Sequence, residues 1–298
     1  MNKIIRIGTC AILSLIIITS SVIVSFAAVY VQDGNFKYQI FNDGTVAWSG
    51  YTSDTVDDVV IPRYYDNSTV ISVANFGLEN NNMIKSVDFM EAPDLNRIGM
   101  YAFHNCSSIE SVLVPDSVSV VEVSAFRDCN ALTDVVFYGN NNVVPVECFY
   151  NCSSLKNVRL SAYLKSIQNR AFAGCTSLRY LELLNTITYI APNAFEGDNS
   201  LTLGVYYNSY AYHYAKDNNI PYVLLDGVKL GDVNVDGVVD ILDATEIQKY
   251  AAESTDFTDE QFELGDINKD GYCDVIDALL VQKSVIGAYE LPQNIIRY

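Results

Sequence analysis

A fixed period of 23 residues runs through the middle of the chain and limits its fold more than any other feature. One column of the repeat is phenylalanine: Phe103, Phe126, Phe149, Phe172 and Phe195. Cysteine follows three residues later in the first four copies: Cys106, Cys129, Cys152 and Cys175. Two aliphatic columns keep the same step: Ile109, Leu132, Leu155, Leu178 and Leu201, and Ile98, Val121, Val144, Ile167 and Ile190. Such a period indicates a solenoid of stacked coils, because one coil cannot bury its apolar residues alone.

Each repeat contains one segment in which apolar and polar residues alternate, as in a half-buried strand. These segments are residues 109–114, 132–137, 155–160 and 178–183. We predict that they stack as parallel strands in a narrow sheet, and that a short turn of helix around pairs such as Ala125-Phe126 closes each coil. The alternation predicts that one set of side chains points outward: Ser111, Leu113, Asp134, Val136, Tyr138, Asn157, Arg159, Tyr180 and Glu182.

The cysteine column has two interpretations. If the four thiols follow the spacing of stacked strands they lie about 5 Å apart, a distance that does not exclude disulfides. The other interpretation, which we favour, is a buried ladder of small apolar side chains, because free cysteine is among the most buried residue types. At the fifth position the ladder ends with Asp198.

The repeats resemble the leucine-rich repeats of the BspA-like family. The matching phrases are AFHNCSSIESVLVP, AFRDCNALTDVVF, CFYNCSSLKNVRL and AFAGCTSLRYLEL. The resemblance implies an α/β leucine-rich-repeat solenoid with parallel strands, which we place with its C-terminal cap at residues 73–225. Residues 28–72, rich in short alternating runs, are expected to form a β-rich N-terminal cap.

A twelve-residue acidic loop occurs twice near the C-terminus, as DVNVDGVVDILD at 232–243 and DINKDGYCDVID at 266–277. Oxygen-bearing side chains at positions 1, 3, 5, 9 and 12, with glycine at 6, are the spacing that wraps a chain around Ca²⁺. The pattern predicts two calcium ions. The expected side-chain ligands are Asp232, Asn234, Asp236, Asp240 and Asp243, and Asp266, Asn268, Asp270, Asp274 and Asp277. The position-7 carbonyls of Val238 and Tyr272 complete the two sets.

Each loop leads into a helical segment, but the residues before Asp232 read as strand or loop. A duplicated calcium loop with only an exiting helix resembles a type I dockerin, a small all-α domain, here at residues 230–291. The resemblance implies a partner, the cohesin domain of a scaffoldin, and assembly into extracellular complexes such as cellulosomes, which act in polysaccharide degradation.

In that family the cohesin contacts lie at loop positions 10 and 11 and in the following helix. The matching residues here are Ile241, Leu242, Gln248, Lys249, Val275, Ile276, Gln282 and Lys283. Many type I dockerins have serine or threonine at positions 10 and 11, where this chain is apolar, so the resemblance leaves the preferred class of cohesin open. The alternative is that these side chains belong to the module's own core. The near-identity of the two halves predicts two docking orientations related by a half-turn.

The first 27 residues have the pattern of a secretory signal peptide. Lys3 and Arg6 precede an apolar stretch, and cleavage is expected after Ala27. No later stretch is long enough to span a membrane. The net charge is −18, and 15 acidic residues against three lysines fall within residues 231–290. This charge indicates a local ion site and disfavours nucleic-acid binding, which needs a basic surface.

Catalytic signatures are scarce. The chain has two histidines, His104 and His213, and both sit where a structural role is expected; no G-x-S-x-G, H-E-x-x-H or P-loop motif occurs. We therefore predict a secreted, non-catalytic binding protein, associated with the cell surface through a scaffoldin. Its repeats would present a surface to a protein, cell or polysaccharide ligand. The alternative is a cellulosomal enzyme or enzyme modulator with an unrecognised site within residues 28–225.

Overall fold

The computed structural model describes residues 28–52, 57–138, 140–292 and 295–296. It contains two compact units: the first runs to Leu181 and includes Thr186–Leu201, and the second comprises Glu182–Asn185 and the chain from Thr202 onward. The signal peptide predicted for residues 1–27 lies outside the described residues.

The N-terminal segment of the first unit forms a β-meander. Strands β1 (Val29–Asp33), β2 (Phe36–Ile40) and β3 (Val46–Tyr51) pair antiparallel in sequence order. Strand β6 (Ser68–Val73) then joins β3 in parallel, and β5 (Tyr64–Tyr65) pairs antiparallel with the start of β6. The chain's single tryptophan, Trp48, is fully buried here. The meander thus closes one end of the repeat stack while its sheet continues into the coils.

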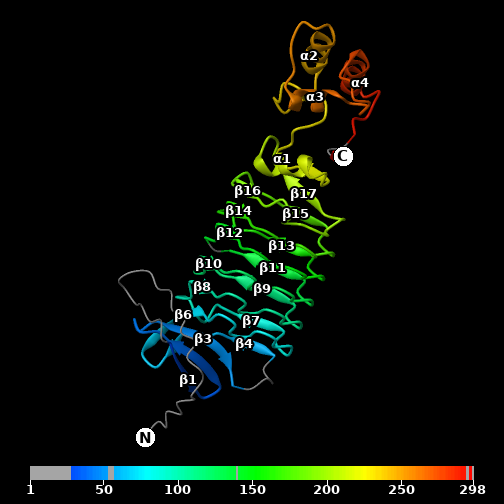
Figure 1. Ribbon diagram of the computed structural model, residues 1–298. Coiled ribbons are helices and arrows are strands. Elements are labelled where there is room, and N and C mark those ends of the chain that lie inside the picture. Colours follow the sequence, from blue (N-terminus) through cyan, green and yellow to red (C-terminus); the bar gives the residue numbers. More distant parts are fainter. Residues whose placement is uncertain (1–27, 53–56, 139, 293–294, 297–298) are drawn as a thin grey trace, which may run out of the picture. The chain divides into compact units, whose positions relative to one another are not determined.

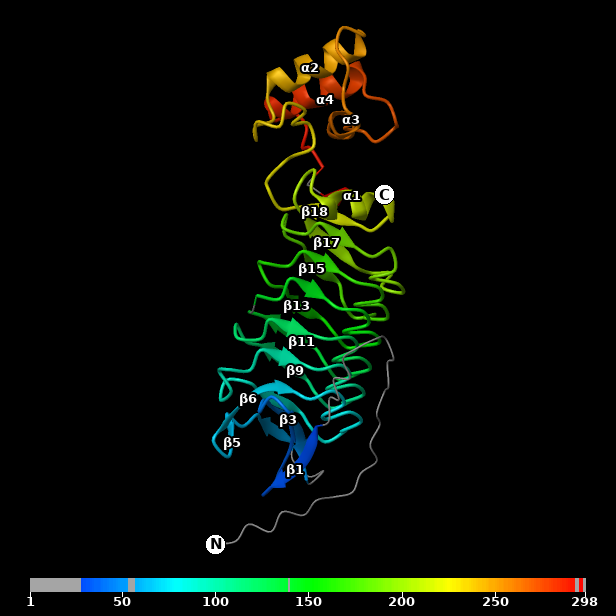
Figure 2. The same ribbon diagram turned by 60° about the vertical axis from the view of Figure 1, so that its left-hand side comes forward.

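The coils place strands in two rows. One row contains β4 (Asp58–Val60), β7 (Ser86–Asp88), β9 (Ser111–Val114), β11 (Asp134–Phe137), β13 (Asn157–Arg159) and β15 (Tyr180–Glu182). Strands β9, β11 and β13 pair in parallel with Val112, Val135 and Val158 in register, and Figure 2 shows them as successive rungs. The predicted parallel sheet is confirmed.

The second row follows the aliphatic column that starts at Ile98. It contains β8 (Arg97–Ile98), β10 (Val120–Val121), β12 (Val143–Val144), β14 (Ser166–Ile167) and β16 (Tyr189–Ile190). Strand β8 pairs with β6 and β10, and β14 pairs with β12 and β16, all in parallel. The sequence marked this column as apolar without indicating that it forms strands.

The prediction that a helical turn closes each coil is wrong. The phenylalanine segments are turns, and the backbone N–H of each phenylalanine donates to the neighbouring coil: Phe103 to the Ala125 carbonyl and Phe149 to the Ala171 carbonyl, both at 2.8 Å. Left-handed residues stand on both sides of the aromatic residue, as at Ser124 (φ 56°) and Asp128 (φ 59°). A helix would use these N–H groups within its own coil, whereas here they join adjacent coils.

The core of the first unit is a column of stacked rings. Successive phenylalanines from Phe103 to Phe195 have ring centroids 5.2–5.7 Å apart and interplanar angles of at most 16°. Beside them the cysteines form a ladder in which each thiol donates to a carbonyl of the preceding coil, as Cys129 does to Phe103 at 3.1 Å. All the cysteines that the structure describes are buried and free. The thiols therefore act as small hydrogen-bonding core residues.

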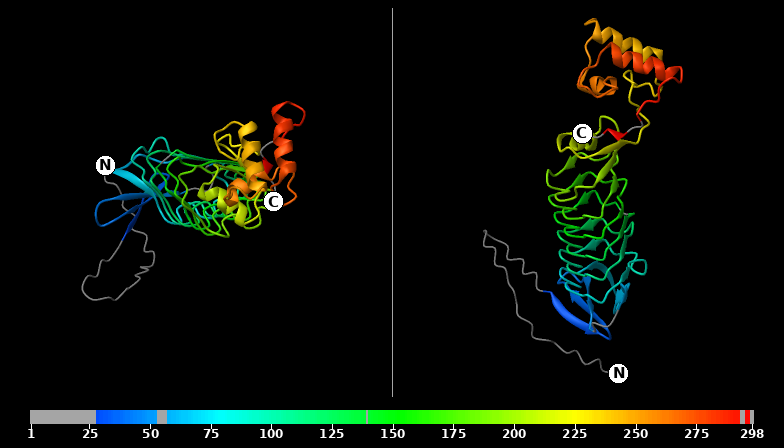
Figure 3. Two further views of the ribbon diagram at one scale, coloured as in Figure 1. Left: turned by 90° about the horizontal axis from the view of Figure 1, so that it is seen from above. Right: turned by 90° about the vertical axis from the view of Figure 1, so that its right-hand side faces the viewer.

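The second unit begins with β17 (Thr202–Val205), α1 (Tyr210–Asp217) and β18 (Tyr222–Leu224), which form a cap. Three helices follow: α2 (Ile241–Ala251), α3 (Asp259–Gly265) and α4 (Val275–Val285). Helices α2 and α4 lie side by side (Figures 1 and 3). A short strand after them, β19 (Ile295–Ile296), returns to pair antiparallel with β18. Among the described residues, none of the helices has the length and apolar character needed to cross a bilayer.

Candidate functional site

The two acidic loops fold in the same way. In each, the backbone N–H of the glycine at position 6 donates to the carboxylate at position 1: Gly237 to Asp232 at 3.0 Å and Gly271 to Asp266 at 3.1 Å. Both glycines have φ near +90° (89° and 88°), a conformation that side chains other than glycine's rarely adopt. The glycine at position 6 is therefore required by the turn itself.

The carboxylate at position 12 anchors each loop from inside. Asp243 is fully buried and accepts the N–H groups of Asn234 at 3.2 Å and Asp240 at 2.9 Å. Asp277, also fully buried, accepts those of Ile267 at 2.8 Å and Asp274 at 2.9 Å. These bonds make position 12 the centre of the folded loop.

The carboxylate at position 9 caps the helix that follows. Asp240 accepts the N–H of Leu242 at 2.6 Å, and Asp274 accepts that of Ile276 at 2.7 Å. Each pairs with the position-12 carboxylate in a capping box, so the helices begin two residues before the last predicted ligand. The second loop is also entered by a helix, α3, which ends at Gly265. The expectation that helices only leave the loops therefore holds for the first loop and is wrong for the second.

The loops bury charge that the chain itself does not neutralise. Desolvation raises the pKa of Asp232, Asp243 and Asp277 above the ordinary range of aspartate. In the second loop Asp266 Oδ1 is buried without any hydrogen-bond partner. Buried carboxylates are normally paired or bound to metal, and oxygen ligands of this kind suit Ca²⁺. The donor set therefore fits a hard divalent cation.

The acidic side chains do not form a ready-made cage. Across the described ranges, no group of three or more His, Cys, Asp or Glu side chains converges as a metal site. The oxygens accept N–H groups of their own loop instead; Asp236 Oδ1, for example, accepts from Val238 at 2.9 Å. The predicted ligand residues thus follow one another around a turn, and their carboxylates accept backbone N–H groups of the same loop.

The apolar residues at positions 10 and 11 lie on the surface. The exposed fractions are 53% for Ile241, 57% for Leu242, 64% for Val275 and 50% for Ile276. The core between the helices is built from other positions: Ala244, Ile247, Ala278 and Val281. The predicted polar contacts lie further along the helices; Gln248, Lys249 and Lys283 are exposed and Gln282 is half-buried.

The two halves are not equivalent on this surface. Where α2 has Thr245, α4 has Leu279, which is 45% exposed. Where Ala252 caps α2, Ile286 caps α4 and is 77% exposed. Helix α4 therefore presents a longer apolar stripe than α2 does.

One buried contact of the second unit was not expected from the sequence. Glu263 in α3 accepts hydrogen bonds from the hydroxyls of Tyr212 at 2.5 Å and Tyr222 at 2.6 Å, and from Lys216 Nζ at 2.6 Å. These partners belong to α1 and β18, so Glu263 joins the acidic-loop module, residues 230–291, to the cap formed by β17, α1 and β18. A single glutamate in the segment Phe-Glu-Leu-Gly gives no signal of this role.

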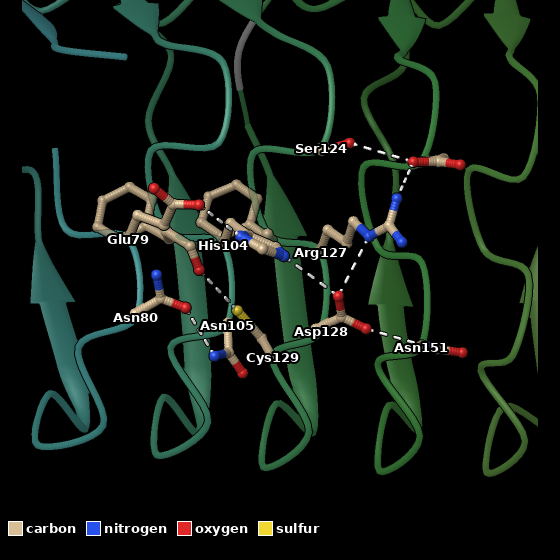
Figure 4. A network of polar contacts seen from close by, with 12 residues as sticks. Glu79, Asn80, His104, Asn105, Ser124, Arg127, Asp128, Cys129 and Asn151 are labelled. Carbon is tan, nitrogen blue, oxygen red and sulfur yellow. Dashed lines mark hydrogen bonds and ion pairs between the residues drawn. The ribbon is translucent and has the colours of Figure 1, made fainter. Parts of the chain in front are cut away.

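A polar ladder runs along the coils of the first unit (Figure 4). His104 lies between Glu79 and Asp128, with its ring nitrogens 2.9 Å and 3.2 Å from their carboxylates. Arg127 donates to Asp128 and to Glu147 in the next coil. The figure shows each residue bridging to a neighbouring coil, so these contacts join coils side to side. His213, in the other unit, contacts Asn208 at 2.8 Å.

Solved structures share the coil architecture. A leucine-rich cell surface protein from Faecalibacterium prausnitzii is 23% identical with a TM-score of 0.50, and the match covers 60% of this chain and 55% of that one. A leucine-rich repeat protein from Eubacterium ventriosum is 19% identical with a TM-score of 0.46, over 55% and 44% of the two chains. The chain thus spans about half the length of these relatives, and the first likeness supports the fold alone. No curated protein matches the chain.

Two family models match the sequence. The BspA type leucine-rich repeat region matches residues 67–203 in six copies, and the dockerin type I domain matches residues 230–286. Both families are non-catalytic, and type I dockerins are calcium-binding domains in general. The chain therefore contains a BspA-type leucine-rich repeat region at residues 67–203 and a type I dockerin domain at residues 230–286.

Proposed function

We propose that this protein is an exported, non-catalytic component of a cellulosome-type complex, which its dockerin attaches to a cohesin domain of a scaffoldin. The observation that carries the proposal is the duplicated acidic loop, each copy followed by a helix with two exposed apolar residues at its start. Attachment through a scaffoldin would keep the protein outside the cell and near its surface.

Calcium would hold the docking module in its folded form, with one ion in each loop. The first ion would be held by the predicted oxygen ligands from Asp232 to Asp243, and the second by those from Asp266 to Asp277. When bound, the ions neutralise carboxylates that burial otherwise penalises. The orphaned Asp266 Oδ1 supports this assignment, because a cation would give it a partner.

The docking surface would be formed by the exposed residues at the helix starts. Ile241 and Leu242 form one half, and Val275 and Ile276 form the other. Apolar residues that are exposed in two symmetric patches indicate a protein contact rather than a core. The lysines and glutamines further along each helix would supply the polar rim.

A quadruple variant tests the attachment. Changing Ile241, Leu242, Val275 and Ile276 to Asp should abolish binding to cohesins of the scaffoldin, because each change puts a charge into the contact. Calorimetric calcium titration should still give two binding events, since none of the four side chains is a predicted ligand. Undiminished cohesin binding by this variant would contradict the assigned surface, and binding of a single ion would contradict the two-site assignment.

Paired substitutions test the two orientations. If either half can dock, Ile241→Asp with Leu242→Asp should weaken binding by less than about tenfold, equivalent to about 1.4 kcal/mol. The pair Val275→Asp with Ile276→Asp should weaken cohesin binding more than the first pair, though still by less than about tenfold, because α4 carries the longer apolar stripe. A loss of binding from either pair alone as large as that of the quadruple variant would refute the two-orientation proposal.

The leucine-rich repeats would present a recognition surface on the sheet that carries β9, β11 and β13. Side chains on its outer face alternate with buried ones, as in β9, where Ser111 and Leu113 are exposed and Val112 and Val114 are buried. A rigid extended sheet is the binding surface that solenoids commonly use. A screen of the intact protein on glycan and peptide substrates checks the non-catalytic assignment: turnover abolished by one carboxylate substitution would overturn it.

A further inference from the structure

A shallow groove of about 240 Å³ indents the outer face of this sheet across β11, β13 and β15. Its lining combines charged, amide, aliphatic and aromatic side chains: Asp134, Val136, Lys156, Asn157, Arg159 and Tyr180. All of them belong to the first unit, where neighbouring coils hold them in register. The groove is therefore a fixed feature of the stack, distinct from the docking module.

The groove carries a net positive charge because its two cations, Lys156 and Arg159, outnumber its single carboxylate, Asp134. Asp134 accepts a hydrogen bond from Asn157 Nδ2 at 2.7 Å and another from the Thr133 hydroxyl. These bonds lower the pKa of Asp134, with a smaller contribution from the charge of Lys156. The carboxylate is thus stabilised in place and positions Asn157 along the groove.

The cations of the groove lack salt-bridge partners. Elsewhere in the unit, arginines are paired across coils, as Arg97 is with Glu122 and Arg170 with Glu196. Lys156 and Arg159 form no ion pair within the described residues, nor does Arg179, which occupies the place of Lys156 one repeat later. The two cations that line the groove, Lys156 and Arg159, are thus available to an anionic ligand, although the chain as a whole has a net charge of −18.

The remaining lining suits a sugar ring. Tyr180 is 45% exposed and contributes an aromatic ring to the lining, and Val136, in register with Arg159, contributes an aliphatic side chain. Asn157 offers amide groups that can bond to hydroxyls, and Arg159 offers the planar fork that recognises carboxylates. A protein partner needs about 800 Å² of surface on each side, whereas this groove is small enough to select one small unit of a ligand.

We propose that the groove binds an acidic glycan, with the sugar ring against Tyr180 and its carboxylate held by Arg159 and Lys156. The inference deepens the proposed recognition role of the sheet face by naming the ligand class. It does not depend on the dockerin assignment, because none of the groove residues lies in the docking module.

Calorimetry on the full-length protein with three short probes tests the ligand class. Trigalacturonate should bind, and its binding should weaken as salt is added. The methyl ester of the same trisaccharide, which keeps the sugar rings but lacks the charge, should bind at least about tenfold more weakly, since a hydrogen bond to a charged group contributes about 1.5–3 kcal/mol. Triglutamate, which has the three carboxylates without the sugar rings, should bind no better than the ester.

Substitutions locate the site. Arg159→Gln and Tyr180→Ala should each weaken trigalacturonate binding by about tenfold or more, because each removes one of the two recognition elements. Lys165→Gln is the matched control: Lys165 is an exposed cation of the same repeat outside the groove, and its loss should change nothing. Unchanged thermal unfolding of each variant shows that the fold is intact.

Several outcomes would overturn the proposal. Absence of trigalacturonate binding would do so, as would equal binding of triglutamate, which would mean that charge alone is read. Equal loss from Lys165→Gln and Arg159→Gln would move the contact away from the groove. Capture by cohesin in calcium is measured separately on the same protein, so failure of the glycan proposal is distinguishable from failure of the attachment.

Discussion

The coil stack and the acidic-loop module are both built by internal duplication, but the repeats are held together by opposite means. In the stack, each repeat offers its neighbour a fully buried phenylalanine ring, as Phe126 does to Phe149 at 5.7 Å. In the module, each repeat places carboxylates inside, and Asp243 and Asp277 are both fully buried. The comparison suggests that the stack is stable by itself, whereas the module depends on an ion.

The difference follows from the free energy of burial. Taking an aromatic side chain out of water is favourable in proportion to its apolar area, so each added coil reinforces the one before it. Taking a carboxylate out of water is unfavourable until a counter-charge is supplied. A stack of coils can therefore be lengthened by simple repetition, while the acidic loops are stabilised only when a counter-charge is supplied.

Removal of calcium should produce the largest contrast between the two regions. At free calcium 1,000-fold above the dissociation constant, each site stabilises the module by about 4 kcal/mol, and EDTA removes that contribution. Helical circular dichroism, to which α2 and α4 contribute, should fall on chelation. The fluorescence of Trp48, which reports only on the first unit, should keep its unfolding transition. A Trp48 transition that moves with the helical signal would break the comparison.

A cavity in the ring column should have the next largest effect, and on the opposite region. Phe149→Ala removes a fully buried ring that stacks on two others, which should destabilise the first unit by about 3–5 kcal/mol. Urea unfolding followed through Trp48 measures the loss, and calcium affinity should stay unchanged. The control is Tyr163→Ala, since that side chain is 61% exposed. A comparable loss from the control would show that the ring column is not what holds the coils.

Asp198 offers a smaller but sharper test, because here the stack itself buries a carboxylate. It occupies the place of the cysteines in the ladder, and its buried carboxylate has no side-chain hydrogen-bond partner among the described residues; the backbone at Cys175 offsets only part of the cost of burial. Desolvation raises its pKa to about 7. Since this exceeds the value of about 3.9 in an unfolded chain, the folded state binds the proton more tightly. The contribution of Asp198 to the stability of the first unit should therefore be fully present below pH about 4 and should be lost as the pH rises through about 7.

The variant Asp198→Asn should remove this pH dependence, because an amide cannot ionise. Above pH about 7 it should be more stable than the natural sequence by an amount on the order of 3 kcal/mol. Asp198→Cys, which continues the ladder, should behave likewise. The midpoints of urea unfolding, followed through Trp48 fluorescence at about pH 5 and about pH 8, provide the measurement. A pH dependence that survives both substitutions would place its origin elsewhere.

The sequence predicted most of what depends on the period. Columns that recur every 23 residues can only be buried together, so the stacked parallel strands follow from the positions of Phe103 to Phe195. The turn geometry of the acidic loops was predictable for a similar reason, because glycine at position 6 and oxygens at fixed steps describe one turn. In both cases a short sequence pattern occurs in several copies, and its recurrence at the same positions makes a chance match unlikely.

What was not predictable depends on contacts outside any local rule. The coils close by hydrogen bonds between neighbours, such as Phe103 N to Ala125 O, and no residue pattern within one coil encodes that choice over a helical turn. Glu263 lies 51 residues from Tyr212, with which it shares a hydrogen bond. The charge of the groove at Arg159 and Tyr180 depends on which cations have ion-pair partners in the folded chain. Pairings of this kind are set by the assembled fold.

The cysteine ladder has a consequence for how the coil stack responds to oxidants. Burial raises the pKa of Cys106 to about 12 and also raises that of Cys129 and Cys152 well above the ordinary thiol value, so almost no thiolate is available to oxidants or alkylating reagents. The protein should therefore keep one covalent state in oxygen-rich and oxygen-poor surroundings alike. A thiol of the ladder can become modified only when its coil unfolds locally, so modified cysteines would report which coils open.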